Sequence, residues 1–484
     1  MALTIPVAEI VENSKNPLLG KHEAWGRVLL GDIATIQNGF PFKSSQFTKG
    51  EGIPLIRIRD VGADSTNTNY VGDYDQAFVV EAGDLLIGMD GDFNCARWRG
   101  PRGLLNQRVC RVILKSDIYH PKFLDYALPG YLKAINDMTS SVTVKHLSSK
   151  SIAEIPLSLP PMDHQKLIVA EIEKQFSRLD EAVANLKRVK ANLKRYKAAV
   201  LKAAVEGRLV ETEAELARRE GRSYETGGRL LQRILETRRS QWQGKGKYKE
   251  PAAPDTTNLP ELPEGWVWVS ASALLREPLR NGHSAKATNN PNGLRAFTLS
   301  AVTVGNFSEE NTKLTVAEPS KVEDLWAMPG DIYVERSNTP ELVGTTCLYN
   351  GPVKFAFIPD LLIRIRVCEL VLPRFVELAL QSDFGRRYFK DRAQGISGTM
   401  PKIDQAAIET YAISLPPQAE QHRIVAEVDR RLSLLRETET QVDADLQRAE
   451  RLRHSILEGA FSGRIVHIGD SAVSTVTGQL LVSV

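Results

Sequence analysis

Two segments of the chain carry an apolar residue at every seventh position. The first stripe is Ile172, Leu179, Leu186, Leu193 and Val200, with Ile168, Val189, Tyr196 and Ala203 on the intervening seam. The second stripe is Val428, Leu435, Val442, Ala449 and Ile456. An apolar repeat of seven predicts a long helix that packs against a partner helix. Each segment therefore predicts a helix of about forty residues, or about 60 Å at the rise of an α-helix.

Proline and glycine mark the ends of both predicted helices. Pro161 and Pro417 prevent an earlier start, because proline lacks an amide donor and disfavours helix in the residue before it. Gly207 and Gly463 stand where the end of a helix favours a left-handed residue.

The two predicted helices differ in charge. Residues 163–204 carry ten Lys or Arg and five Asp or Glu, a net charge of +5, whereas residues 419–460 carry seven and nine, a net charge of −2. Opposite net charge favours pairing of the two helices with each other. The alternative, in which each amphipathic helix packs only on its own domain, stays open from these residues.

The helices belong to a longer duplication. Residues 141–210 and 397–466 align without a gap at a spacing of 256, with 21 of 70 positions identical, among them Gln165 with Gln421. A period of this length indicates tandem duplication of a whole structural unit.

The segments before the helices predict strands and turns. In the first half the expected strands are 52–61, 83–89 and 107–114, with a helix at 121–128. In the second half they are 293–302, 330–336 and 361–367, with a helix at 373–380. Trp25 corresponds to Trp266 and Pro121 to Pro373, but few residues between these landmarks agree. The two halves therefore share a common frame, defined by the order of these landmarks, whereas the sequences between the landmarks differ.

Composition places the chain among ordinary globular proteins. It has 484 residues, 42% of them hydrophobic, and a net charge of only +3, which by itself is no evidence for nucleic acid. No apolar run reaches the length of a membrane span and no signal peptide is evident, so we expect a cytoplasmic protein without membrane contact. The four cysteines have no metal-binding spacing and are expected to be reduced thiols.

The motifs of several enzyme classes do not occur in the sequence. It has no G-x-x-x-x-G-K-[ST] loop, no G-x-G-x-x-G after a strand, no His-x-x-x-His pair and no G-x-S-x-G. These absences predict no catalytic residue, metal site or cofactor in this chain. A duplicated chain with two divergent modules is typical of a recognition scaffold.

The motifs that do occur resemble a known family. The element "SLPPQAEQHRIVAEV" followed by a long helix and "SGRIV", the approach "LPELPEGWVWV", and the opening "AWGRVLLGDIATIQNGFPF" resemble type I restriction-modification specificity subunits, over residues 25–466. The first copy departs from the pattern at Asp163-His164, although Gln165 and Ile168 keep the register.

The resemblance implies an α+β fold with two mixed α/β target recognition domains, joined by two long helices in an antiparallel coiled coil with pseudo-twofold symmetry. The expected parts are recognition domain 1 (1–160), spacer helix 1 (161–210), a connector (211–264), recognition domain 2 (265–416), spacer helix 2 (417–466) and a C-terminal tail (467–484). The tail is either a short edge strand or a loose end.

The resemblance also implies function and partners. Such subunits are not catalytic: each domain reads one half of a two-part, asymmetric site in double-stranded DNA, and the helices set the spacing. They bind two methyltransferase subunits and further restriction/translocase subunits in a phage-defence system. S-adenosylmethionine, ATP and Mg belong to those partners.

Basic residues in three segments are candidate DNA contacts. Arg57 and Arg59 alternate on a predicted strand, as do Arg364 and Arg366, and arginine pairs reach guanine or phosphate oxygens. The segment "ARWRGPR" places Arg97, Arg99 and Arg102 around Trp98. The alternative for the strand pairs is a solvated face.

A Ser-x-Thr element with a following lysine recurs in both copies and is a further candidate for phosphate binding. Its residues are Ser141, Thr143 and Lys145 in the first copy and Ser397, Thr399 and Lys402 in the second. The alternative is a structural turn retained in both halves.

Rival functions remain from the sequence alone. The first is a self-contained methyltransferase or nuclease. The second is a coiled-coil scaffold protein that binds DNA only non-specifically. A third, within the same family, is a specificity protein that acts only in modification.

Overall fold

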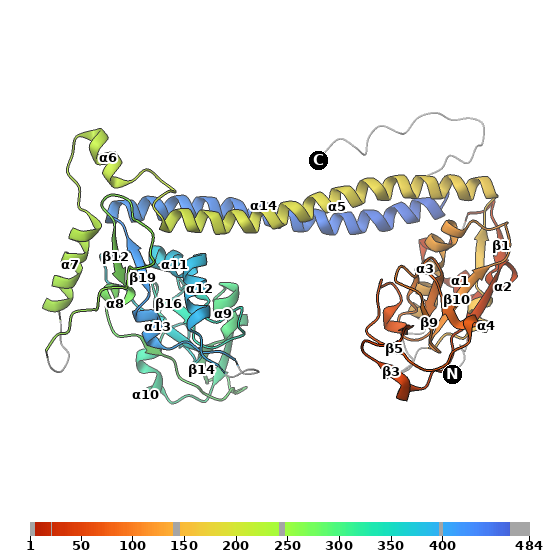
Figure 1. The fold of residues 1–484 in the computed structure, drawn as a ribbon, viewed down its shortest axis with the longest axis horizontal. Coiled ribbons are helices and arrows are strands. Elements are labelled where there is room, and N and C mark those ends of the chain that lie inside the picture. Colours follow the sequence, from red (N-terminus) through yellow and green to blue (C-terminus); the bar gives the residue numbers. More distant parts are fainter. Residues whose placement is uncertain (1–4, 21, 139–145, 242–246, 396–399, 465–484) are drawn as a thin grey trace. The chain divides into compact units, whose positions relative to one another are not determined.

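The computed structural model describes residues 5–20, 22–138, 146–241, 247–395 and 400–464. The chain forms two compact units (Figure 1). The first comprises the residues up to Lys187 together with those from Asp443 onward, and the second comprises Arg188–Val442.

Short helices and short strands make up most of the first unit. Its helices are α1 (Val7–Asn13), α2 (Leu30–Ile33), α3 (Pro121–Met138) and α4 (Ser149–Ala153). Its strands are β1 (Gly26–Leu29), β2 (Ala34–Asn38), β3 (Phe47–Thr48), β4 (Ile53–Ile56), β5 (Asn69–Tyr70), β6 (Val79–Val80), β7 (Leu85–Gly88), β8 (Cys95–Arg97), β9 (Gly103–Leu105), β10 (Val109–Leu114) and β11 (Pro156–Leu159).

The second unit has more helices and fewer strands. Its helices are α6 (Glu213–Glu220), α7 (Gly227–Ser240), α8 (Ala271–Leu274), α9 (Leu299–Val304), α10 (Pro319–Val322), α11 (Pro373–Gln381), α12 (Asp383–Arg392) and α13 (Gln405–Glu409). Its strands are β12 (Val267–Ser270), β13 (Arg280–Asn281), β14 (Leu294–Phe297), β15 (Thr312–Thr315), β16 (Ile332–Glu335), β17 (Thr346–Leu348), β18 (Leu362–Ile365) and β19 (Ala412–Leu415).

The central sheet has the same strand order in both units. It is β2-β10-β7-β8 in the first and β13-β18-β16-β17 in the second, antiparallel throughout. A separate antiparallel pair closes each module: Gly26 of β1 lies opposite Leu159 of β11, and Val267 of β12 opposite Leu415 of β19. The shared order confirms the predicted duplication of a common frame.

The outer parts of the two units differ. The first unit adds a five-stranded sheet, β3-β5-β4-β9-β6, in which β4 and β9 are parallel, whereas the described residues of the second add the two-stranded β14–β15 pair. The prediction that the frame is kept while its contents diverge is therefore confirmed.

Each core joins the central sheet to the helix that follows it. In the first unit Phe123 and Leu128 of α3 share a buried cluster with Ile87 of β7. In the second, Phe375 of α11 shares a cluster with Ile332 and Ile363 of the sheet. Since both helices start with a proline at the predicted position, the proline landmarks hold, although α3 runs well beyond the expected end at residue 128.

Two predicted strands are shorter than expected. The strand expected at 52–61 ends at Ile56, and the chain turns into a 3-10 helix, Ile58–Asp60. The turn forms because the Asp60 carboxylate accepts a hydrogen bond from the Arg57 amide at 2.9 Å. The strand expected at 293–302 likewise ends at Phe297, where α9 follows.

The two long helices are confirmed. They are α5 (Met162–Val205) and α14 (Gln418–Phe461), of 44 residues each. Both end near a glycine with positive φ, +67° at Gly207 and +74° at Gly463, as expected for helix C-termini. Each helix contributes residues to both units.

Within each unit α5 packs against α14. In the first, Leu179 forms a buried cluster with Ala449 and Ile456, so an early part of α5 meets a late part of α14. In the second, Val200 shares a cluster with Val428, so the late part of α5 meets the early part of α14. The helices therefore run antiparallel in both units.

The predicted apolar stripe of α14 is buried at all five positions. The seam predicted for α5 is wrong at Val189 and Tyr196, which are 40% and 46% exposed. Contact between two helices buries only a narrow stripe of each helix. Tyr196 lies at the edge of this stripe, where its hydroxyl accepts a hydrogen bond from the Arg431 guanidinium at 3.5 Å. Among the described residues, every helix is too short or too polar to span a bilayer.

A buried glutamine fastens each long helix to its module. The Gln165 Oε1 accepts from the His120 amide at 2.7 Å, while its Nε2 donates to Pro160 O at 2.8 Å. Gln421 repeats this geometry, accepting from the Leu372 amide at 3.0 Å and donating to Pro416 O at 3.2 Å. Both side chains are fully buried, which explains their identity in the two copies.

Gln421→Leu is expected to lower the free energy of unfolding of the second unit by about 2–3 kcal/mol, because it leaves the half-buried Leu372 amide and the buried Pro416 carbonyl unpaired. Hydrogen exchange of the α11 and β19 amides in the intact chain measures this loss. His422→Leu on the neighbouring exposed position is the matched control and should change stability by less than about 0.5 kcal/mol. Equal effects of the two changes would contradict a specific role for Gln421.

Candidate nucleic-acid interface

The loop at residues 96–102 combines buried anchors with exposed arginines. Arg97 ends β8 and forms an ion pair with Asp125 at 2.6 Å. Trp98 is 1% exposed, and its indole donates to Pro101 O at 2.8 Å, so it belongs to the core and not to a stacking surface. Arg99 and Arg102 are exposed. Arg102 contacts Glu81 at 3.2 Å and remains 54% exposed.

Arg57 and Arg59 do not share a strand face, so that premise of the prediction is wrong. The 3-10 turn separates them: the Arg57 guanidinium lies 5.9 Å from the centre of the Phe47 ring, whereas Arg59 is exposed. Of the two, only Arg59 is presented to solvent as a free-standing cation.

Arg364 and Arg366 share a face, as predicted, but that face is buried. Arg364 is 3% exposed and donates to Glu277 at 3.0 Å and to Asp324 O at 2.7 Å. Arg366 binds Asp331 through Nε at 2.5 Å and contacts Glu277 at 3.2 Å. Because both guanidinium groups are occupied inside the protein, they hold the central sheet together and are not available to DNA in this structure.

Five predicted contacts lie outside the described residues: Ser141, Thr143, Lys145, Ser397 and Thr399. Lys402 is described and exposed. Its backbone pairs with Gln394 in both directions at 2.9 Å and lies beside Ser337, next to the end of β16.

Lys402 belongs to a group of three cations around a surface hollow of about 430 Å³. The other two are Arg336, which directly follows β16, and Arg392, the last residue of α12. Asp404 also lines the hollow, but none of the three cations forms an ion pair with a described acidic residue. The Arg392 guanidinium lies 3.7 Å from the centre of the Tyr388 ring. We name Arg336, Arg392 and Lys402 the second-unit basic cluster. Sequence reasoning missed both arginines, because only folding brings these positions together.

The first unit has different chemistry at the equivalent place. The Ile403 amide donates to Arg336 O at 2.9 Å in the second unit, and the Leu147 amide donates to Met89 O at 2.8 Å in the first. The neighbouring Asp90 is bonded to His146 at 2.6 Å and lies 3.4 Å from Arg108. The same backbone geometry thus presents a methionine and an acid in one unit and cations in the other.

A buried carboxyl supports the loop that follows Arg336. Glu335 is fully buried and accepts hydrogen bonds from the Thr303 hydroxyl at 2.5 Å and the Asn338 amide at 2.6 Å. Burial raises the pKa of Glu335 above its usual value, against the opposing effect of these two bonds. The carboxyl ties α9 to residues 335–338, where the second-unit basic cluster begins.

This pKa shift predicts a pH dependence. A carboxyl whose pKa is raised in the folded state contributes stability below its unfolded pKa and loses it as pH rises through the folded pKa. As pH rises, the native protein should therefore lose stability relative to the Glu335→Gln variant. Urea unfolding at about pH 4.5 and about pH 8 tests this sign, and a difference that favours the native protein more at high pH would contradict it.

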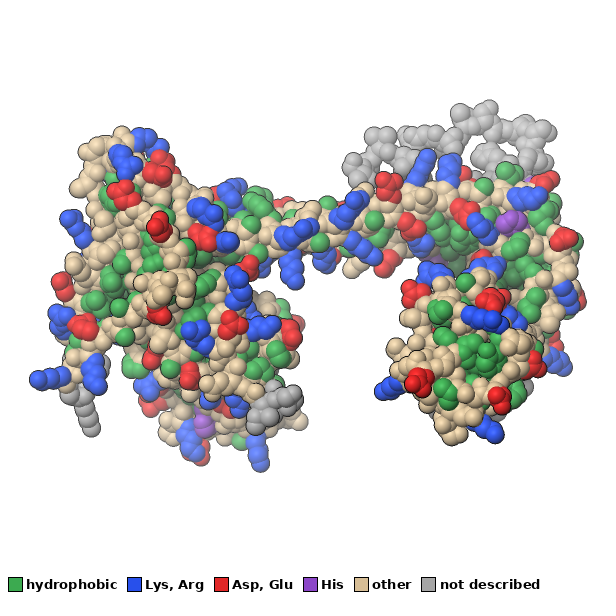
Figure 2. All heavy atoms as spheres, viewed as in Figure 1, with side chains coloured by type: hydrophobic (Ala, Val, Ile, Leu, Met, Phe, Trp, Pro, Cys, Tyr) green, Lys and Arg blue, Asp and Glu red, His purple; other side chains and the backbone are tan. Residues whose placement is uncertain are grey.

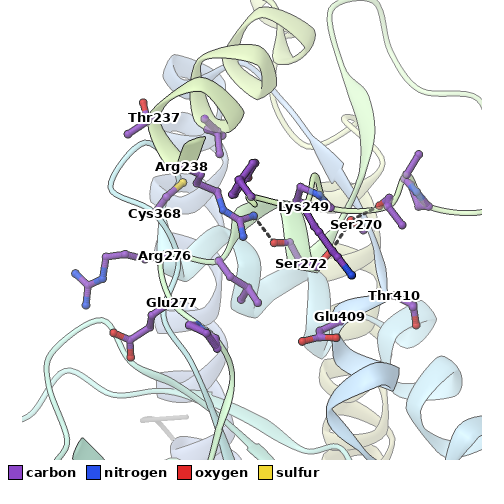
Figure 3. Close-up of a pocket in the computed structure, with 18 of the residues that line it drawn as sticks. Thr237, Arg238, Lys249, Ser270, Ser272, Arg276, Glu277, Cys368, Glu409 and Thr410 are labelled. Carbon is purple, nitrogen blue, oxygen red and sulfur yellow. Dashed lines mark hydrogen bonds between the residues drawn. The ribbon is translucent and has the colours of Figure 1, made fainter. Parts of the chain in front are cut away.

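A cavity of about 930 Å³ in the second unit lies beside α7 and α8 (Figure 3). Four basic and four acidic residues line it, so its charge selects neither anions nor cations. Arg238 reaches across to donate to Ser272 O, which uses part of the basic lining for structure.

The described residues contain no group of His, Cys, Asp or Glu arranged to hold a metal ion. All four cysteines are free thiols, and burial raises the pKa of Cys110 and of Cys347 to about 12, which disfavours the nucleophilic thiolate.

Sequence comparison finds known proteins that are similar to this chain. Residues 22–195 match the type I restriction modification DNA specificity domain. The chain is 44% identical over 208 residues to the EcoBI specificity subunit of Escherichia coli, a match that covers 43% of this chain and 44% of that relative. It is 22% identical over 460 residues to the EcoKI specificity subunit of Escherichia coli K12, covering 92% of this chain and 89% of that one.

The fold has a solved counterpart. A chain from a structure of complex assembly and conformational transition of the type I R-M system superposes with a TM-score of 0.61 at 16% identity, covering 91% of this chain and 98% of that one. The duplicated frame, the paired long helices and the sequence matches agree in their likeness to type I restriction-modification specificity subunits, and the family model supports this likeness for residues 22–195.

Proposed function

We propose that this chain is the DNA-specificity subunit of a type I restriction-modification complex and reads a two-part, asymmetric DNA site, one half-site per unit. It is a non-catalytic recognition subunit. The observation that carries the proposal is the equivalent position after β7 and β16, where one backbone frame presents Met89 and Asp90 in one unit and Arg336 and Ser337 in the other. Two similar frames with unlike surfaces suit two unlike half-sites.

The exposed cations supply the contacts to DNA in this proposal. In the second unit these are the basic cluster, and in the first they are Arg59, Arg99 and Arg102. A cation without an acidic partner binds phosphate at the lowest cost, because no ion pair must first be broken, whereas Arg102 must first leave its exposed ion pair with Glu81. The repeated Ser-x-Thr elements at 141–143 and 397–399 remain candidates for phosphate contact.

Residues 1–160 and 265–416 serve as the two target recognition domains, and α5 and α14 form the conserved spacer. The partners are double-stranded DNA, two methyltransferase subunits and restriction/translocase subunits, in the cytoplasm. S-adenosylmethionine, ATP and Mg act in those partner subunits.

Selection from randomised duplexes tests the proposal. The chain, purified in complex with its methyltransferase subunit, is incubated with the DNA pool at about 150 mM salt, and bound duplexes are sequenced. We expect one gapped motif with two unlike halves. A salt-dependent affinity without any enriched sequence would instead support the non-specific coiled-coil scaffold.

A further inference from the structure

A glycine turn follows the first strand of each central sheet. Strand β2 ends at Asn38 and is followed by Gly39, and β13 ends at Asn281 and is followed by Gly282. The Gly39 amide donates to the first carbonyl of β10 at 2.9 Å, and the Gly282 amide donates to the first carbonyl of β18 at 3.2 Å. A Cβ on either glycine would lie 2.1 Å from a backbone oxygen of a neighbouring segment. Both turns therefore require glycine and hold the backbone in one place.

The asparagine before each glycine anchors the turn through its side chain. The Asn38 Nδ2 donates to Ser149 Oγ at 3.1 Å, and the Asn281 Oδ1 accepts from Gln405 Nε2 at 3.2 Å. Ser149 begins α4 and Gln405 begins α13, and the two positions are 256 residues apart (405 − 149), as in the duplication. The turn thus has an equivalent partner in both units.

An aromatic ring follows the glycine in both units. The Phe40 amide donates to the last carbonyl of β9 at 2.9 Å, and the His283 amide donates to Ile358 O at 3.0 Å, so the two residues occupy equivalent backbone positions. Phe40 is 44% exposed, and His283 is half-buried. The rings of Phe42 and Phe78 each lie 5.1 Å from the Phe40 ring, between centroids, so the exposed ring is supported by packing.

Both turns lie beside the position where the two units present different chemistry. In the first unit the Met89 amide donates at 3.0 Å to the carbonyl that directly precedes β10. In the second, the Arg336 amide of the second-unit basic cluster donates at 2.8 Å to the carbonyl that directly precedes β18. Since each glycine binds the next carbonyl of the same strand, the turn and the residue after β7 or β16 are bonded to adjacent residues.

We propose that Phe40 and His283 are specificity-determining residues that each contact one base pair of their own half-site, and that the Phe40 ring contacts a thymine methyl group. This inference rests on the proposed function. A phenyl ring has no hydrogen-bonding atom, and the apolar group that base pairs present in the major groove is the thymine methyl. An imidazole has two ring nitrogens, so His283 suits the hydrogen-bonding edge of a base.

The rigidity of the turn favours such a contact. Because Gly39 fixes the backbone and two rings support Phe40, little conformational freedom is lost when the ring meets DNA. The exposed part of the ring is apolar surface, and its burial against a methyl group stabilises the complex. One backbone position would thus select different bases in the two half-sites, because its side chain differs.

Selection from randomised duplexes tests the two residues, with the chain in complex with the methyltransferase subunit proposed as its partner. The native complex first defines the motif. Phe40→Ala should then lose the preference for thymine at one position of one half, and His283→Ala should relax one position of the other half. Phe384→Ala removes a similarly exposed ring, 38% exposed on α12, and should leave the motif unchanged.

A change in the DNA alone tests the methyl contact and leaves the protein intact. Deoxyuridine replaces each thymidine of the motif in turn, which removes only the methyl group. At one position this should lower the affinity of the native complex roughly fourfold, the effect of one buried methyl group. The same replacement should not weaken the Phe40→Ala complex further, because the ring that contacts the methyl is already absent. Fluorescence anisotropy gives these affinities, with deoxyuridine outside the motif as the control.

Several results would overturn the proposal. They are a motif without thymine, a Phe40→Ala motif identical to the native one, relaxation of the same half by both variants, and a native affinity that no deoxyuridine lowers. Absence of any motif with the native complex would instead contradict the proposed function, and this inference with it.

Discussion

Arg366→Met is expected to lower the free energy of unfolding of the second unit by about 3–5 kcal/mol. The change removes both guanidinium bonds to Asp331, which is 1% exposed, and leaves that carboxylate buried without its cation. Asp331 would keep only the Met328 amide at 2.9 Å and the Tyr333 hydroxyl at 3.3 Å as donors. Hydrogen exchange of the β16 and β18 amides in the intact chain measures the loss, because these central strands open only when the unit unfolds.

The matched control is Arg59→Met, the same substitution at an exposed position, which should change stability by less than about 0.5 kcal/mol. The pair of variants separates a structural arginine from a surface one. If Arg366→Met left the strands protected and instead abolished DNA binding, the assignment of Arg366 to the core would be wrong.

Removing the second-unit basic cluster is expected to weaken DNA binding by roughly 10–100-fold at about 150 mM salt. The variant is Arg336→Gln, Arg392→Gln and Lys402→Gln together. Each lost phosphate contact should reduce the slope of log affinity against log salt by about 0.9. Fluorescence anisotropy of the assembled complex on a labelled duplex, between about 50 and 300 mM salt, gives both quantities.

A control with the same change in net charge is Lys321→Gln, Arg229→Gln and Arg430→Gln, at exposed positions on α10, α7 and α14 (Figure 2 shows how widely such cations are spread). Its affinity and salt slope should stay close to those of the native complex. Equal losses in the two triple variants would mean that net charge, and not this cluster, governs binding.

The long-range frame could be predicted from the sequence because its signals are periodic or repeated. The seven-residue stripes located α5 and α14, and the 256-residue spacing located the two modules. The identity of Gln165 and Gln421 was visible in the duplication, but only the structure shows that both side chains are buried and make the same bonds to their own modules.

The candidate DNA-binding residues were harder to predict from the sequence than the fold. Alternation of Arg364 and Arg366 indicated a shared face but not its burial, because the acids that neutralise them, Glu277 and Asp331, come from distant positions. A local side chain, Asp60, turned the strand at Arg57 into a 3-10 helix. The second-unit basic cluster depends on three segments that meet only in the fold, so neither spacing nor composition marked it.

The measurement that tests the central claim most directly is a map of DNA methylation. The chain is co-expressed with the methyltransferase subunit proposed as its partner in a host without other methylation, and N6-methyladenine is located by single-molecule sequencing. The account predicts a single asymmetric motif with two specified halves separated by a gap of unspecified bases. Absence of any motif, from a complex shown to assemble, would contradict it.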